Sequence, residues 1–288
     1  MTNWSAEQDR RVDASLERLD AIFRDPCVLR RIWGHLDEMI LQHHVYNGLV
    51  AYKPEDRITI VDIGCGGGEL IHMLSIYFKN AKLFGIDYNQ RSIIRAQDLL
   101  GHRASLVAGA YDDVFSEVQE ADLVFCSEVF EHVEDPSHLL STLSRLVKPG
   151  GYLSLSTPSG WMWWLPSLSG FVKLFRSPKK FHDLYLTPET HWKAALSIHP
   201  AVRPKKLRAL LKREGFRIKL RRSALWRMNI NGVIYWFFSL YARKRPIHAS
   251  RVFESYYRFL DALMNICPLF RVFETRIILL AQKEPDKI

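Results

Sequence analysis

Residues 57–78, RITIVDIGCGGGELIHMLSIYF, decide the fold class because a strand pattern changes into a helix pattern across a run of glycines. The β-branched stretch 58–63 predicts a buried strand, and apolar residues at helical spacing over 70–78 predict a helix. A ligand can approach the backbone of the turn between them, since three positions there have no Cβ. These positions are Gly64, Gly66 and Gly68.

The next predicted strand, AKLFGIDYN at 81–89, ends in the acid Asp87. An acid at a strand end about 20 residues beyond a glycine run is placed to accept hydrogen bonds from two ribose hydroxyls. The glycine run alone would also fit a purely structural turn. It has the spacing GxGxG rather than GxGxxG, and no basic residue in it could hold a pyrophosphate. Together the two motifs predict a site for a nucleoside without phosphates rather than for NAD.

Strands and helices continue to alternate along the chain. Strands are predicted over 121–127 and 152–158, with a helix over 138–147 and a KPGG turn over 148–151 between them. The segment 271–283 reads as a last, antiparallel strand. This order predicts an α/β fold with a doubly wound, mostly parallel sheet that binds its ligand at the carboxyl ends of the strands.

Four stretches in this order resemble the class I S-adenosylmethionine-dependent methyltransferases. They are VDIGCGGG (61–68), GIDYN (85–89), DLVFCSEVFEHVEDP (122–136) and LVKPGGYLSLSTPSG (146–160). The resemblance implies a Rossmann-like, seven-stranded fold and S-adenosylmethionine as methyl donor. It also implies that the three glycines approach the amino-acid part of the donor, that Asp62 lies beside that part, and that Asp87 binds the ribose.

Many members of this class have an acid after the glycine that follows the third strand, where it meets the adenine amino group. Here Ala110 stands at that position, in LVAGAYDDVF. Asp112 or Asp113 could substitute, or both could be solvated loop acids. We expect Tyr111 to face the adenine ring and Ser127, at the end of the fourth strand, to contact the cofactor.

The fourth predicted strand runs into an acidic stretch with a histidine, CSEVFEHVEDP at 126–136. If EVFEHV starts a helical turn, Glu128, Glu131 and His132 share one face and could hold a divalent cation such as Mg²⁺. Such a cation would lower the pKa of an acceptor hydroxyl. Without a metal, His132 or Glu128 could act as general base. The alternative is local: Glu128 caps backbone donors and His132 packs against its neighbours.

EVFEHV followed by STP is similar to the ubiquinone-biosynthesis O-methyltransferases, in which the Glu-x-x-Glu-His set is associated with a divalent cation. The small-RNA 3′-terminal 2′-O-methyltransferases have a similar set and a later histidine, for which His191 is the catalytic candidate here and His199 the other choice. These resemblances imply O-methylation of a small lipophilic acceptor, such as a quinone precursor, lipid or lipid-linked sugar. RNA 2′-O-methylation is the first alternative, and a non-catalytic nucleoside-binding protein of this fold is the second.

Charge is distributed unevenly along the chain. Residues 1–172 hold 15 Lys and Arg against 23 Asp and Glu, whereas residues 173–288 hold 25 against 8, so the second half would bind an anionic partner. Two aromatic stretches, 160–181 and 228–242, predict a substrate lid or a peripheral membrane contact. The alternative for 228–242 is a helix packed against the core. No nucleic-acid-binding module is evident, which makes nucleic acid the less favoured partner.

The length of 288 residues and a hydrophobic content of 48% predict one large domain with an elaboration. We predict an N-terminal helical segment (1–56), a methyltransferase domain (57–226), a helical insertion (227–270), and a last strand with a tail (271–288). The cysteines show no metal-ligand spacing, and the charged N-terminus lacks a secretory signal. These features favour a cytoplasmic protein, at the inner face of a membrane if the aromatic stretches contact lipid. The sequence does not predict an oligomeric state.

Overall fold

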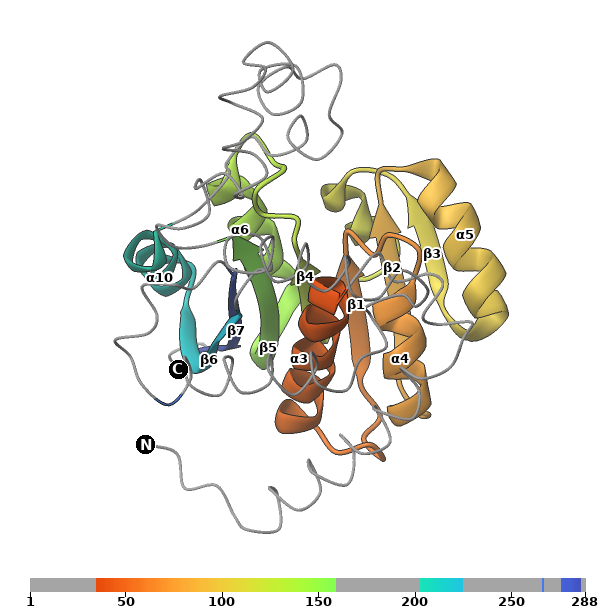
Figure 1. Ribbon diagram of the computed structural model, residues 1–288, viewed down its shortest axis with the longest axis horizontal. Coiled ribbons are helices and arrows are strands. Elements are labelled where there is room, and N and C mark those ends of the chain that lie inside the picture. The colour runs from red at the N-terminus through yellow and green to blue at the C-terminus, as the bar shows by residue number, and fades with distance from the viewer. Residues whose placement is uncertain (1–34, 159–202, 225–265, 267–275, 286–288) are drawn as a thin grey trace, which may run out of the picture.

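The computed structural model describes residues 35–158, 203–224, 266 and 276–285. Within them one seven-stranded sheet has the order β3-β2-β1-β4-β5-β7-β6 (Figure 1). The strands are β1 (Thr59–Ile63), β2 (Lys82–Asp87), β3 (Ser105–Ala108), β4 (Ala121–Ser127), β5 (Val147–Pro158), β6 (Phe216–Ala224) and β7 (Arg276–Lys283). Strands β1 to β5 pair in parallel, and β7 is antiparallel to β5 and β6. The predicted mostly parallel sheet with an antiparallel last strand is confirmed.

Helices cover both faces of the sheet, as a doubly wound fold requires. On one face, α3 (His35–Ala51), α4 (Glu69–Tyr77) and α5 (Gln90–Leu100) pack together. On the other face lie α6 (Pro136–Leu146) and α10 (Pro204–Arg213). Two short 3₁₀ helices, η1 (Gly101–Arg103) and η2 (Tyr111–Ser116), flank β3. Figure 1 shows β3 and β6 at the two ends of the sheet.

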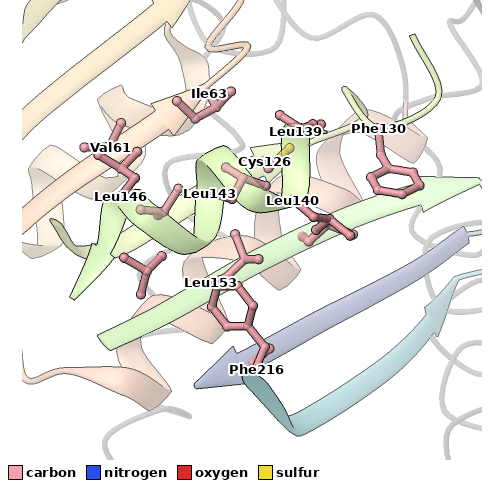
Figure 2. Packing of buried hydrophobic residues seen from close by; sticks show 14 of the residues in the cluster. Val61, Ile63, Cys126, Phe130, Leu139, Leu140, Leu143, Leu146, Leu153 and Phe216 are labelled. Carbon is pink, nitrogen blue, oxygen red and sulfur yellow. The ribbon is translucent and has the colours of Figure 1, made fainter. Parts of the chain in front are cut away.

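Helix α6 illustrates how the sequence forms and places these helices. Asp135 caps its first turn by accepting hydrogen bonds from the backbone N–H groups of Ser137 and His138, and Pro136 occupies the first helical position. Figure 2 shows the leucines of α6 that lie over the sheet: Leu139, Leu140, Leu143 and Leu146, all fully buried. Burial of each leucine contributes on the order of 2 kcal/mol, which fixes α6 over β4 and β5.

The expected helical turn over EVFEHV does not form. Glu128 has a left-handed backbone (φ 55), and the backbone N–H of His132 bonds the carbonyl of Val129 in a tight turn. The helix begins only at Pro136, because proline disfavours helical backbone in the residue before it and Asp135 supplies the cap. Glu128, Glu131 and His132 therefore do not share a helix face.

The predicted KPGG turn lies inside β5 instead of before it. Strand β5 begins at Val147, and its register with β4 shifts between Ala121 and Leu123. Gly150 takes a left-handed conformation (φ 80), which allows this irregularity within the strand.

Helix α3 falls within the predicted N-terminal segment and is attached to the sheet by buried polar contacts. His44 Nδ1 lies 2.7 Å from the hydroxyl of Ser154, and the side-chain amide of Asn47 donates to the same hydroxyl at 2.8 Å. His44 is fully buried, which, together with the neighbouring His43, lowers its pKa to about 3. His44 is therefore neutral in the folded protein at every pH above about 3.

Acidification is expected to reduce stability through His44. Its folded pKa of about 3 lies below the unfolded value of 6.5, so the unfolded chain binds the extra proton and stability falls as pH falls below 6.5. The cost is about 2 kcal/mol between pH 7 and pH 5. Urea unfolding at pH 7 and pH 5 measures the free energy of unfolding. Its decrease from pH 7 to pH 5 should be smaller by this amount in His44→Gln than in wild type. The exposed-residue control His102→Gln should behave as wild type, and an equal pH dependence in all three would contradict the prediction.

The ends of three strands, β5, β6 and β7, lie side by side at one edge of the sheet. Arg276 opens β7 and pairs with Pro158, the end of β5, and with Ala224, the end of β6. The predicted insertion, apart from residue 266, and both aromatic stretches lie outside the described residues. Among the helices that the structure describes, none is both long and apolar enough to cross a membrane.

Candidate active site

A pocket of about 550 Å³ opens at the carboxyl ends of the parallel strands. Its walls come from the glycine loop after β1, the ends of β2, β3 and β4, and the turn before α6. Six of the predicted site residues line it: Gly64, Asp87, Tyr111, Ser127, Glu128 and His132. The ligand edge expected from the sequence is therefore where the structure places half of the twelve predicted site residues.

Gly64 brings the glycine loop into contact with the turn after β4. Its φ is 75, and a Cβ added there would lie 2.3 Å from Cγ2 of Val129. The backbone N–H groups of Gly64 and Cys65 both donate to the carbonyl of Ile86 at the end of β2. Gly68, by contrast, does not line the pocket, and its bare Cα instead allows α5 to approach at Ala96. The loop thus needs glycine for packing as well as for ligand access.

Asp87 holds the loop and faces the pocket. Its Oδ2 accepts a hydrogen bond from the backbone N–H of Gly66 at 2.9 Å, and its Oδ1 accepts one from Asn89 at 2.8 Å. Each carboxylate oxygen can accept more than one hydrogen bond, so both can still receive a hydroxyl from the pocket. This is the arrangement that binding of two ribose hydroxyls requires.

On the side of the pocket near β3, Tyr111 lies where it was expected and Asp112 does not. Tyr111 lines it, and partial burial with the nearby Asp112 and Asp135 raises the pKa of the Tyr111 phenol. Asp112 lies outside the lining, because its two oxygens contact Thr142 (2.6 Å) and His138 (2.9 Å) on α6. Partial burial alone would raise the pKa of Asp112, but these hydrogen bonds lower it.

Three further acids, Asp113, Glu134 and Asp135, lie on this side of the pocket, and only two of them line it. Asp113 caps the backbone N–H of Ala110 and does not line the pocket either. Glu134 and Asp135, which the sequence reasoning did not select, are the acids that do line it. Neither Asp112 nor Asp113, the two candidates for the adenine contact, therefore lines the pocket.

The opposite end of the pocket carries an ion pair. Glu128 is fixed by its backbone N–H, which donates to the carbonyl of Ser156, and by its Oε2, which accepts from Nε of Arg276 at 2.5 Å. The Arg276 side chain is only 9% exposed and that of Glu128 24%. Oε1 of Glu128 is buried and has no hydrogen-bond partner among the described residues.

Glu131 and His132 follow directly but point to different partners. Glu131 is buried (3% exposed), and its Oε2 accepts from the hydroxyl of Thr157 at 3.2 Å. Burial and the neighbouring Glu128 raise the pKa of Glu131 well above its usual range. His132 lines the pocket, with Nε2 4.0 Å from Oε1 of Glu131. His191 and His199 lie outside the described residues.

With the fold and pocket in place, a family model described as a methyltransferase domain matches residues 37–220, well over half of the chain. The chain belongs to this methyltransferase family. Its match begins within α3, upstream of the boundary at residue 57 predicted from the sequence. The predicted resemblance to S-adenosylmethionine-dependent methyltransferases is confirmed.

Several curated relatives of this methyltransferase share a name. The ubiquinone biosynthesis O-methyltransferases of Leptothrix cholodnii and Ralstonia nicotianae are 36% and 38% identical to it over 108 and 104 residues. These matches cover 35% and 34% of this chain and 45% and 42% of the relatives, so the matched stretch spans less than half of either relative. The enzyme of the same name from Pseudomonas fluorescens is 28% identical over 172 residues, covering 54% of this chain and 71% of that protein.

Solved structures show the same fold at low identity. An S-adenosylmethionine-dependent methyltransferase from Mesorhizobium loti superposes with a TM-score of 0.52 at 15% identity, over 87% of this chain and 99% of that one. Phosphoethanolamine N-methyltransferase 2 from Haemonchus contortus gives 0.53 at 14% identity, over 85% and 52%. At these identities the likeness establishes the Rossmann-like methyltransferase fold.

The pocket fits the S-adenosylmethionine that this family uses. A Cβ added at Gly66 would meet no atom within 4 Å, so the loop there borders open space. Asp62 lies buried behind the loop, outside the lining, and its Oδ1 has no partner among the described residues. Burial, Asp87 and Glu69 raise the pKa of Asp62 well above its usual range, so a cationic group bound nearby would favour its ionised form.

The predicted cation site does not fit the residues present. Oε2 of Glu128 is taken by Arg276, and Glu131 is buried against Thr157. Across the described part of the chain, no group of three or more His, Cys, Asp or Glu side chains could hold a metal ion. The three residues chosen from the sequence are adjacent, yet their side chains do not converge.

Sequence reasoning missed Arg276, the residue that organises the end of the pocket near β4. A signal was available, since Arg276 begins the apolar run RIILLA within the segment 271–283, which reads as an antiparallel strand. The start of an antiparallel strand lies at the same sheet edge as the carboxyl ends of its parallel neighbours. A cation at that start should therefore have been placed beside the acids that follow β4.

Proposed function

We propose that the protein transfers a methyl group from S-adenosylmethionine to an oxygen of a small lipophilic acceptor, such as a quinone precursor, a lipid or a lipid-linked sugar. The observation that carries this proposal is a single pocket with Asp87 and the glycine loop at one end and Glu128 and His132 at the other. The names of the curated relatives support oxygen as the methylated atom.

When bound, S-adenosylmethionine supplies a methyl group on a positively charged sulfur. The sulfur–carbon bond breaks as the oxygen–carbon bond forms, the sulfur keeps the electron pair, and the hydroxyl proton must pass to a base. His132 is the proposed base: it lines the pocket, and its backbone is fixed by the hydrogen bond to Val129. Glu128 is the proposed anchor of the acceptor hydroxyl. The remaining contribution of the protein is alignment of the two reactants.

Transfer of labelled methyl groups tests this function. A phenolic quinone precursor in detergent should become labelled, and His132→Ala should lower kcat on the order of 100-fold while the Kd for S-adenosylmethionine is unchanged. His102→Ala, which changes an exposed histidine in η1 outside the pocket lining, is the matched control and should retain full activity.

Other outcomes of the same assay separate the alternatives. Label that enters added RNA and not the lipophilic fraction would favour RNA 2′-O-methylation. Binding of S-adenosylmethionine without labelling of any cell extract would favour a non-catalytic nucleoside-binding protein.

A cationic surface on α10 and β6 supports contact with anionic lipid, where a lipophilic acceptor resides. Leu207 and Leu211 face the core, and the solvent side carries exposed cations: Arg203, Lys205, Lys206, Arg208, Lys212, Arg213, Arg217 and Lys219. Each cation near an anionic membrane adds about 1 kcal/mol of attraction. With the acceptor presented in vesicles, anionic lipid should raise the labelling rate at low salt, and added salt should remove this gain.

A further inference from the structure

Arg276 places a positive charge beside two carboxyl groups at the end of the pocket near β4. Its Nε bonds Oε2 of Glu128 at 2.5 Å, and its charge also acts on the buried Glu131. Ionised groups with so little exposure are stable only when paired, so the guanidinium and Glu128 form one unit.

We propose that Arg276 is a resident cation that takes the place of a divalent metal ion at this site. The inference rests on the proposed function only in assigning the acceptor hydroxyl to this end of the pocket. Of the two glutamates that the sequence suggested as metal ligands, Glu128 instead bonds a cation built into the chain, and Glu131 is influenced by the charge of that cation.

The position of Arg276 in the sheet fixes its backbone near Glu128. Arg276 is the first residue of β7 and pairs in register with Pro158 on one side and Ala224 on the other. Its backbone is therefore held by strands on both sides, at the edge where Glu128 follows β4. A metal ion bound to Glu128 would lie beside this guanidinium, and the two positive charges would repel each other.

A guanidinium interacts with a substrate hydroxyl differently from a metal ion. It donates hydrogen bonds in a fixed plane, and it offers no coordination position for a substrate oxygen. Arg276 is therefore a positioning residue: it holds one oxygen of Glu128 and leaves Oε1, which has no partner among the described residues, for the acceptor hydroxyl. Deprotonation of the acceptor then depends on protein groups rather than on a Lewis acid.

Titration with Mn²⁺, followed by calorimetry in the absence of acceptor, tests the proposal. Wild type and Arg276→Lys should bind no stoichiometric Mn²⁺, because both keep a cation beside Glu128. Arg276→Met removes the charge and keeps an unbranched side chain, so the freed carboxylates should bind about one Mn²⁺ per chain. The double variant Glu128→Gln/Arg276→Met should lose that binding again.

Binding of S-adenosylmethionine shows which variants are folded. If Arg276→Met does not bind S-adenosylmethionine, Arg276→Gln takes its place in the titration. Labelled transfer by wild type should be unchanged by EDTA, and Arg276→Met should raise KM for the acceptor on the order of 10-fold. Stoichiometric Mn²⁺ binding by wild type that Glu128→Gln abolishes would overturn the proposal. So would a folded Arg276→Met or Arg276→Gln variant that gains no Mn²⁺. The metal titration needs no acceptor, so its result stands even if the proposed O-methylation fails.

Discussion

Gly64→Ala is expected to weaken S-adenosylmethionine binding on the order of 100-fold. An alanine there would have to keep the left-handed φ of 75, which costs about 1 kcal/mol for a residue with a Cβ. Its Cβ would also lie 2.3 Å from Val129, so either the glycine loop or the turn after β4 must move. Both line the pocket, and each loss of about 1.4 kcal/mol lowers the affinity tenfold.

Gly101→Ala is the matched control for this variant. Gly101 ends α5 with a positive φ of 56, but a Cβ there would meet no atom within 4 Å. We expect Gly101→Ala to lose about 1–3 kcal/mol of stability through backbone strain alone and to keep the wild-type Kd, measured by calorimetry. Equal affinity of Gly64→Ala and wild type would show that the close approach to Val129 does not shape the donor site.

Asp87→Ala is expected to reduce S-adenosylmethionine affinity by two to three orders of magnitude. The change removes the acceptor of the Gly66 and Asn89 N–H groups, and it also removes the proposed partner of the ribose hydroxyls. Hydrogen bonds to a charged group contribute about 1.5–3 kcal/mol each, so loss of two ribose contacts accounts for an effect of this size. Asp87→Asn should bind with intermediate affinity, since an amide has only one accepting oxygen.

Thermal unfolding with and without the cofactor separates this effect from simple destabilisation. A ligand that binds the folded state raises Tm according to its concentration relative to Kd, so wild type should gain Tm and Asp87→Ala should gain almost none. Asp98→Ala, an acid on the exposed side of α5, is the control and should gain as much as wild type. A normal gain by Asp87→Ala would remove Asp87 from the cofactor site.

The cofactor end of the site could be predicted from the sequence because its signals are local. The apolar run before Gly64 and the strand that ends in Asp87 each carry their own pattern, and the parallel pairing of β1 with β2 brings them together. The structure adds that Asp87 bonds the glycine loop directly. No feature of either segment alone reveals that contact.

The acceptor end could not be predicted in the same way, because its partners are distant in the chain. Glu128 and Arg276 are 148 positions apart. Distant partners also explain the wrong expectation for Asp112 on the cofactor side, because Asp112 contacts Thr142 and His138 on a helix that follows another strand. The spacing of EVFEHV fits a helix, but the serine at the end of β5 binds the Glu128 backbone and holds it out of helical geometry. Tertiary contacts overrode local spacing at this point.

One rung of the sheet, Pro158–Arg276–Ala224, joins the ends of three strands. Residues 159–202 follow Pro158, and residues 225–275 lie between Ala224 and Arg276 in the sequence. The glycine loop and Asp87 follow strands on the other side of β4. A change at this rung would therefore disturb three strand ends near Glu128 at once, whereas the strands that carry the glycine loop and Asp87 do not take part in it.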